Sequence, residues 1–244
     1  MIPPSWWAGA NLESMAQRKE SLERVLERLE GFYGRPASPE VTDPLEMILF
    51  ENIAYLASDA KRAAAWKTFR TRIGTKPAQI LAASPSELVP IARAGILAAD
   101  RVSKVQDVAA IALEHFGGDL AKALDAAPRE ARKALKRFPG IGDPGAEKIL
   151  LFSRREKVLA LDSNGLRVLL RLGFGSETKS YAASYRSVQE ATRSQWRSDF
   201  TGLIQAHQLL RRHGQETCKR THPLCERCPV TRHCAYFRSR SDKA

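Results

Sequence analysis

Four cysteines near the end of the sequence have the clearest chemical potential. Cys218, Cys225, Cys228 and Cys234 are its only cysteines, with the spacing C-x6-C-x2-C-x5-C. A disulfide framework is not expected, because its cysteines would be scattered over a small secreted fold and we find no secretory signal. Four thiolates in one loop indicate a metal site, and both Zn²⁺ and a [4Fe-4S] cluster accept four cysteines. Zinc usually binds two paired knuckles, so the single C-x2-C pair favours the iron–sulfur cluster.

A glycine-rich turn is the second informative feature. The segment Pro139-Gly140-Ile141-Gly142 lies between two expected helices. Its two glycines permit a tight turn and a close approach of the backbone to a ligand. Backbone amides at such a turn can hold a DNA phosphate without reading the base sequence. The turn alone is weak evidence, because any connection between helices can use it.

An acidic residue follows the turn about twenty residues later. Asp162 ends the apolar run Leu159-Ala160-Leu161 at an expected helix start. The turn, this aspartate and the four-cysteine loop, in this order and at these spacings, resemble the endonuclease III branch of the helix-hairpin-helix DNA glycosylases. The resemblance covers nearly the whole chain, including the segment 206–214 that leads into the first cysteine.

The resemblance implies a fold and its division into domains. It implies an all-α, two-domain helix-hairpin-helix glycosylase fold with a six-helix barrel over residues 42–157. The hairpin lies near the end of that barrel. A second helical domain would combine residues 1–41 and 158–244 and carry the [4Fe-4S] loop 218–234.

The resemblance also implies an activity. Enzymes of this kind flip a damaged or mispaired base out of double-stranded DNA and cleave its N-glycosidic bond, as in base excision repair. Positive charge builds on the sugar as the bond breaks, and a preorganised carboxylate stabilises that charge. Asp162 matches the catalytic aspartate of the family. Its plainer interpretation is an N-cap of the next helix. Residues 139–142 of the hairpin are expected to contact DNA.

One position departs from the family pattern. Bifunctional members have a lysine after the hairpin that forms a Schiff base with the sugar, and Pro144 stands at its place. Proline has no amine for this chemistry. Asn164, two residues after Asp162, matches the monofunctional members and is assigned to DNA binding. We therefore predict a monofunctional glycosylase. A glycosylase/AP lyase that uses another amine such as Lys148 and a non-catalytic iron–sulfur DNA-binding protein are the alternatives.

Further residues resemble parts of the family's DNA-binding site. Glu51 lies in an otherwise apolar expected helix, at the place where adenine glycosylases have a glutamate that protonates the departing base. Tyr55 is one helical turn further and can stack on a flipped base. Ile96 and Leu97 resemble the loop whose apolar side chains enter the base stack. The alternatives are a buried or solvent-edge acid at Glu51 and inward packing at the start of a helix for Ile96 and Leu97.

The composition agrees with a folded protein that binds nucleic acid. Lys and Arg total 39 against 27 Asp and Glu, which gives a net charge of +12, and 43% of the residues are hydrophobic. A polyanionic partner is favoured because each neutralised phosphate releases counterions, although a basic surface also serves solubility. No apolar run approaches the roughly 20 residues of a membrane span. We expect a cytoplasmic, nucleoid-associated monomer without membrane association.

The elements that position these residues are expected to be helices. Apolar residues recur at helical spacing along almost the whole sequence, and no convincing alternating strand pattern occurs. Asp43 and Asp143, each followed by proline, are expected N-caps. The expected helices span residues 12–33, 44–55, 60–73, 77–82, 85–94, 98–115, 120–126, 128–136, 144–153, 163–172, 181–192 and 199–212.

Overall fold

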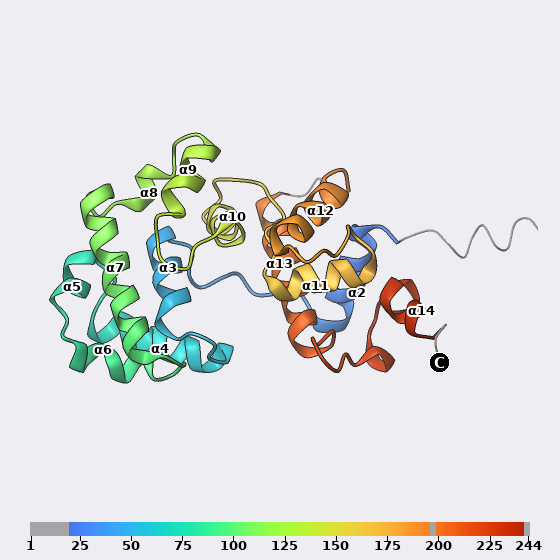
Figure 1. The fold of residues 1–244 in the computed structure, drawn as a ribbon, viewed down its shortest axis with the longest axis horizontal. Helices are drawn as coiled ribbons and strands as arrows, with labels where there is room; N and C mark the ends of the chain where they lie inside the picture. The colour runs from blue at the N-terminus through green and yellow to red at the C-terminus, as the bar shows by residue number, and fades with distance from the viewer. Residues whose placement is uncertain (1–19, 196–198, 242–244) are drawn as a thin grey trace, which may run out of the picture. The chain divides into compact units, whose positions relative to one another are not determined.

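The computed structural model describes residues 20–195 and 199–241. Within these ranges the regular structure consists of α-helices and two short 3-10 turns, with no strand (Figure 1). The all-α prediction is confirmed. Within the same ranges, no helix combines the length and the apolar character needed to cross a membrane. Residues 12–19 of the helix expected over 12–33 fall outside the described residues. Its expected course through residues 20 and 21 is wrong, because Ser21 caps a helix that begins at Leu22.

The helices follow the expected order, and most of their ends agree within a few residues. Two differences are larger: α13 continues four residues past its expected end, and a last helix, α14, was not expected. The helices are α2 (Leu22–Tyr33), α3 (Pro44–Ile53), α4 (Asp59–Arg72), α5 (Pro77–Ala82), α6 (Pro85–Ala92), α7 (Ala98–Phe116), α8 (Leu120–Ala123), α9 (Pro128–Leu135), α10 (Asp143–Phe152), α11 (Ser163–Leu172), α12 (Tyr181–Arg193), α13 (Phe200–Glu216) and α14 (Ala235–Ser241), with 3-10 turns at Cys225–Arg227 and Thr231–His233.

The chain folds into two compact units. The hairpin unit comprises Ala37–Ala160 and Asp199–Ile204, and the cysteine unit comprises Met1–Pro36, Leu161–Ser198 and Gln205–Ala244. The start of α13 is therefore assigned differently from the sequence-based boundaries, which placed residues 199–204 with the termini. Contacts explain the difference. The Lys157 ammonium lies over the Phe200 ring at 5.6 Å, and Arg154 donates to Thr201 Oγ1 at 3.2 Å.

In the hairpin unit, α7 packs against α3, α5 and α6. The core includes Trp66 and Phe69, whose rings stack at 5.7 Å and are almost fully buried. Asp43 caps α3, as expected, by accepting a hydrogen bond from Glu46 N at 2.9 Å. The cap expected at Asp143 is wrong. Gly142 occupies the N-cap position of α10, and Asp143 is its first residue, with its carboxylate 2.7 Å from Lys136 Nζ.

In the cysteine unit, apolar faces of α2, α11 and α13 form buried surfaces. Leu22 and Leu29 of α2, Leu169 of α11 and Leu210 of α13 are fully buried. The extension of α13 has a physical reason at Gly214, which a sequence pattern indicates as a helix breaker. A Cβ at this position would lie 2.7 Å from Asn164 Cβ, so only glycine lets α13 pass the start of α11 this closely.

Candidate functional site

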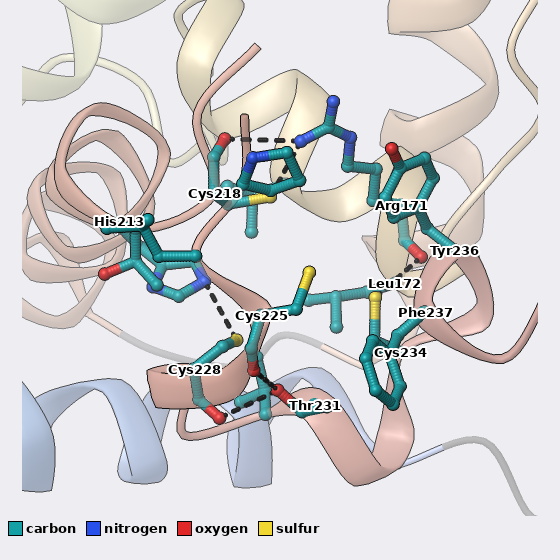
Figure 2. A pocket seen from close by; sticks show the side chains of 15 residues that line it. Arg171, Leu172, His213, Cys218, Cys225, Cys228, Thr231, Cys234, Tyr236 and Phe237 are labelled. Carbon is teal, nitrogen blue, oxygen red and sulfur yellow. Dashed lines mark hydrogen bonds between the residues drawn. The ribbon is translucent and has the colours of Figure 1, made fainter. Parts of the chain in front are cut away.

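The four cysteines line one hollow in the cysteine unit. Figure 2 shows their sulfurs turned toward this space, with α11 on one side and the loop after α13 on the other. Among the described residues, no three His, Cys, Asp or Glu side chains lie close enough to share one metal ion. The sulfurs are spread around the hollow. Burial raises the pKa values of the Cys228 and Cys234 thiols.

The cysteine loop has little apolar core of its own. Between Cys218 and Cys234, only Val230 and Cys234 itself are buried. The backbone there has two 3-10 turns, in which Thr231 Oγ1 donates to Cys225 O at 2.6 Å. A short loop with so few buried apolar side chains needs another source of stability. Four soft thiol donors around a hollow with apolar walls suit a bound iron–sulfur group.

Arg171 of α11 braces this loop. Its guanidinium donates to the carbonyl oxygens of Lys219 at 2.7 Å and Arg220 at 2.8 Å. It also donates to Cys218 Sγ at 3.4 Å (Figure 2). The same group lies over the Tyr236 ring at 4.5 Å. One cation of α11 thus fixes the start of the cysteine loop and faces one of its sulfurs.

Asp162 caps α11 and keeps an accessible carboxylate. Its Oδ1 accepts hydrogen bonds from Asn164 N at 3.0 Å and Gly165 N at 2.8 Å. Its Oδ2 accepts from Asn164 Nδ2 at 3.1 Å and lies 3.5 Å from Arg211 Nε. The side chain remains 28% exposed. The N-cap interpretation is therefore correct, and the second oxygen still carries charge at a partly open position.

Arg167 continues the hydrogen bonds from Asp162 toward the cysteines. Its Nη2 donates to Asn164 Oδ1 at 2.9 Å and to Gly214 O at 2.7 Å, while its Nε donates to Cys218 O at 3.1 Å. An unbroken path of hydrogen bonds thus joins the aspartate, the asparagine and the backbone of the first cysteine. A shift of the cysteine loop would therefore change the positions of the Asn164 and Asp162 side chains.

Two tyrosines of α12 lie beside Asp162. Tyr185 is buried, and its hydroxyl accepts a hydrogen bond from Leu161 N at 3.4 Å. Tyr181 stacks on Tyr185 with the ring centroids 6.2 Å apart, and it is 48% exposed. Burial and the charge of Asp162 raise the pKa of Tyr181. An exposed aromatic ring thus stands near the aspartate.

The turn between α9 and α10 is anchored from inside. Gly140 has a positive φ of 77° and, like Gly142, is exposed. Ile141 is only 8% exposed, and its N–H donates to Phe138 O at 3.2 Å. The buried Asn52 of α3 donates to Pro139 O at 3.3 Å. Of the residues predicted to contact DNA, the two glycines are therefore exposed, whereas Ile141 is buried and anchors the turn.

The structure brings Glu51 and Lys148 together. Lys148 Nζ lies 2.5 Å from Glu51 Oε1, and Arg62 Nη1 lies 3.6 Å from Glu51 Oε2. The Glu51 side chain is 36% exposed and that of Lys148 25% exposed. Glu51 is therefore neither a fully buried acid nor a carboxylate alone in solvent. It is the anion of a three-residue cluster at the border of α3, α4 and α10.

The segment that holds Ile96 and Leu97 contacts Tyr55 through the backbone. Ile96 N donates to Tyr55 O at 3.0 Å, and a Cβ at Gly95 would lie 2.4 Å from that same oxygen, so glycine is required there. Ile96 is 50% and Leu97 59% exposed, which contradicts their inward packing. The structure adds Leu56, which is 68% exposed and, like Leu97, has a φ of +56°.

Arg101 supports this group of exposed residues. Its guanidinium lies 4.0 Å from the centroid of the Tyr55 ring, and the residue is only 8% exposed. Its burial beneath Tyr55 leaves little of the guanidinium open to a phosphate. The cation instead holds the tyrosine ring in place.

Several residues near the candidate site were not found from the sequence. Arg211 and Arg167 gave no signal because basic residues occur throughout the chain. Leu56 could have been recognised only from its backbone conformation, and Asn52 only from its burial. A polar residue in an otherwise apolar helix was the only available signal for Asn52.

Comparisons in sequence point in one direction. No family model matches the chain. Endonuclease III of Sulfolobus acidocaldarius is 34% identical over 110 residues, which are 45% of this chain and 46% of that protein. Endonuclease III of Thermotoga maritima is 22% identical over 205 residues, 84% of this chain and 89% of that protein. The match at the higher identity thus spans about half of the relative's length.

Comparisons of structure agree. A trapped covalent intermediate of endonuclease III with DNA superposes with a TM-score of 0.71 at 18% identity, covering 90% of this chain and 97% of that one. A thermostable thymine-DNA glycosylase gives a TM-score of 0.70 at 18% identity, covering 89% and 95%. At these identities the likeness establishes the fold.

Proposed function

The chain is endonuclease III-like in sequence and has the helix-hairpin-helix glycosylase fold, and from this premise we propose that it is a base-excision-repair DNA glycosylase. It cleaves the N-glycosidic bond of a damaged or mispaired base that has been flipped out of double-stranded DNA. We further propose that it is monofunctional. The arrangement around Asp162 is the observation that carries the proposal.

Asp162 has the features that glycosidic cleavage needs. Two backbone amides at the start of α11 hold Oδ1, so the carboxylate cannot swing away. Oδ2 is positioned by the Asn164 amide and lies at a partly exposed place. A fixed negative charge there stabilises the positive charge that develops on the sugar as the base departs. It can also orient the attacking water. Tyr181 and Asn164 are beside the same carboxylate and are suited to contact the nucleotide.

The cysteines would hold a [4Fe-4S] cluster. In such a cluster each of four thiolates binds a different iron, so the sulfurs surround a volume, whereas a zinc ion draws four sulfurs to about 2.3 Å from one centre. All four cysteines line the same hollow, which supports a group bound by all of them. The bound group would cross-link the loop. The hydrogen bonds of Arg171 and Arg167 with the loop backbone would then fix the loop against α11.

The hairpin unit would hold the duplex. The exposed glycines of the turn present backbone amides to a phosphate, and the positive end of α10 adds to the attraction. Tyr55, Leu56, Ile96 and Leu97 form an exposed apolar group that is suited to enter the base stack. We assign the wedge to Ile96 and Leu97, with Leu56 beside them, and the stacking surface to Tyr55.

The absence of lyase activity is proposed from Pro144 and Lys148. Pro144 has no amine, and Lys148 is ion-paired with Glu51 at 2.5 Å. Lys148 would have to leave this ion pair before its nitrogen could attack the sugar. For Glu51 we propose an electrostatic role at the pocket border, in which Arg62 and Lys148 hold its carboxylate.

A lesion screen tests the proposal. End-labelled duplexes would carry uracil, a thymine mismatch, an oxidised pyrimidine, an alkylpurine, hypoxanthine or adenine opposite oxoguanine. Each reaction is divided, and one half is treated with hot alkali, which cuts abasic strands. We expect at least one duplex to be cut only in the alkali-treated half.

Two other results would change the assignment. Strand cleavage without alkali, together with borohydride trapping of the enzyme, would show a lyase, and Lys148→Ala would then identify the amine. DNA binding without release of any base would favour a non-catalytic iron–sulfur protein.

A further inference from the structure

A buried row of polar side chains lies behind Cys228, and the proposed function gives it no role. His213 Nε2 lies 3.6 Å from Cys228 Sγ, a contact that Figure 2 marks with a dashed line. The other ring nitrogen, Nδ1, lies 3.0 Å from the hydroxyl of Tyr33, which in turn lies 2.6 Å from Thr217 Oγ1. His213 is 1% and Thr217 2% exposed. These residues come from α2, from α13 and from the residue that follows α13.

We propose that Tyr33 and Thr217 hold His213 in the tautomer whose proton is on Nε2, so that the ring donates a hydrogen bond to the Cys228 sulfur of a bound cluster. This inference rests on the [4Fe-4S] group of the proposed function. It makes His213 a positioning and tuning residue for the cluster. It also connects α2, at the other end of the sequence, to the metal site.

The direction of the hydrogen bonds follows from the Cys228 sulfur, at which the row ends. A cluster-bound thiolate has no proton and can only accept a hydrogen bond. The neutral imidazole must then carry its proton on Nε2, which leaves Nδ1 as an acceptor. The Tyr33 hydroxyl therefore donates to Nδ1 and accepts from the Thr217 hydroxyl. All three hydrogen bonds point toward the sulfur, and no buried donor or acceptor of the row is left without a partner.

The row is closed to solvent at His213 and Thr217. Both residues are almost fully buried, so their polar side-chain atoms depend on their neighbours in the row. Tyr33 is itself held in place. Arg212 lies over its ring at 4.8 Å and donates to its carbonyl oxygen at 3.0 Å. The phenol is thus fixed before any metal binds.

The consequence is a measurable change in the cluster. A donor to a ligand sulfur stabilises negative charge, and the reduced cluster carries more of it than the oxidised cluster. The hydrogen bond therefore raises the reduction potential. It also opposes loss of the Cys228 thiolate from iron by protonation. Loss of the row should lower the potential and accelerate iron release.

Tyr33→Phe is the direct test, because it keeps the ring and removes the donor to Nδ1. Tyr236→Phe is the matched control. Tyr236 also stands at the cysteine hollow, but its hydroxyl contacts Arg240 at 3.4 Å, outside the row. The intact holoprotein is examined by protein-film voltammetry and by the rate of iron transfer to a chelator. We expect Tyr33→Phe to have a more negative potential and at least threefold faster iron release, with Tyr236→Phe unchanged.

His213→Leu provides a second measurement if Tyr33→Phe does not fold, and it should move both quantities at least as far in the same direction. Equal potentials and equal iron release in wild type and in the row variants would overturn the inference. A shift of the same size in Tyr236→Phe would overturn it as well. A wild-type protein that carries zinc instead of iron is a different result, visible before any variant is made, and it would refute the cluster together with this inference.

Discussion

At the scale of a single residue, Asp162 has an observed role as a helix cap and a proposed role in catalysis. Its Oδ1 caps α11 and its Oδ2 lies at a partly open position, so the structural and the catalytic interpretations use different oxygens. An N-cap alone would be served about as well by asparagine. Catalysis would not, because asparagine carries no charge. Substitution by asparagine therefore separates the two roles.

Asp162→Asn should keep the fold and lose base release. The amide oxygen can still cap α11, but the negative charge beside the developing sugar cation is gone, and the rate should fall at least about 100-fold. DNA affinity should be unchanged or tighter, because repulsion of phosphate falls. Single-turnover base release and duplex binding measure the two effects.

Asp119→Asn is the control, since Asp119 also caps a helix, through Lys122 N at 3.1 Å. It should leave base release unchanged. Normal base release by Asp162→Asn would remove the aspartate from the mechanism.

Leu97 has strain that an exposed leucine does not need for folding. Its φ of +56° is left-handed at the N-cap of α7, and it is 59% exposed. Strain kept at an exposed position indicates function. Leu97→Asn should raise the free energy of unfolding by about 1 kcal/mol, because asparagine tolerates the left-handed conformation better than leucine. It should lower base release about tenfold if the apolar side chain enters the stack.

Chemical denaturation and single-turnover kinetics measure these two effects. The comparison is Leu113→Asn, at a 47% exposed leucine in the interior of the same helix. That change should lower stability and leave base release alone. Gain of stability with full activity in Leu97→Asn would contradict the wedge assignment.

At the scale of an element, the turn before α10 depends on one backbone conformation. Gly140 has a φ of +77°, yet a Cβ there would meet only Asn52 Oδ1, at an ordinary 3.7 Å. Gly140→Ala should therefore cost about 1–2 kcal/mol of unfolding free energy from backbone strain, without a steric clash. It should also weaken binding to undamaged duplex, since the outward-facing amides would turn. Thermal unfolding and fluorescence anisotropy are the measurements.

Gly31→Ala is the same chemical change as Gly140→Ala but should change stability in the opposite direction. Gly31 lies inside α2, with nothing within 4 Å of an added Cβ, so alanine should raise stability by about 1 kcal/mol. Equal effects of the two substitutions would show that the conformation of the turn is not what matters.

At the scale of the whole molecule, the cysteine unit should depend on its bound group while the hairpin unit does not. The loop between Cys218 and Cys234 buries only Val230 and Cys234, whereas the hairpin unit has a continuous core around Trp66 and Phe69. The purified protein should be yellow-brown with about four irons per chain. Removal of iron by a chelator should increase hydrogen exchange in peptides from Gln205 onward.

Peptides from Ala37–Ala160 are the internal control and should exchange as before. Unchanged exchange near the cysteines after complete loss of iron would mean that the loop is stable without the cluster. Cys225→Ala should reproduce the effect of chelation, since it removes one of the four sulfurs that face the hollow.

Local sequence determined much of this protein. The positions of the helices, the glycine turn and the single four-cysteine loop follow from hydrophobic spacing, backbone freedom and residue chemistry within short segments. The all-α fold, the endonuclease III-like character and the N-cap at Asp43 were predicted from these features. The N-cap predicted at Asp143 is wrong, since Gly142 is the N-cap of α10 and the Asp143 carboxylate lies beside Lys136, seven residues earlier.

Only the tertiary structure decided which side chains meet. Lys148 pairs with Glu51 across 97 positions, and Tyr33 reaches His213 across 180. Arg101 is buried beneath Tyr55, 46 positions earlier in the chain. No local pattern contains these partners, because the covered face of a helix and the residue that covers it depend on how distant segments pack. The sequence therefore proposes which residues carry the chemistry, and packing determines their charge partners, their exposure and their orientation.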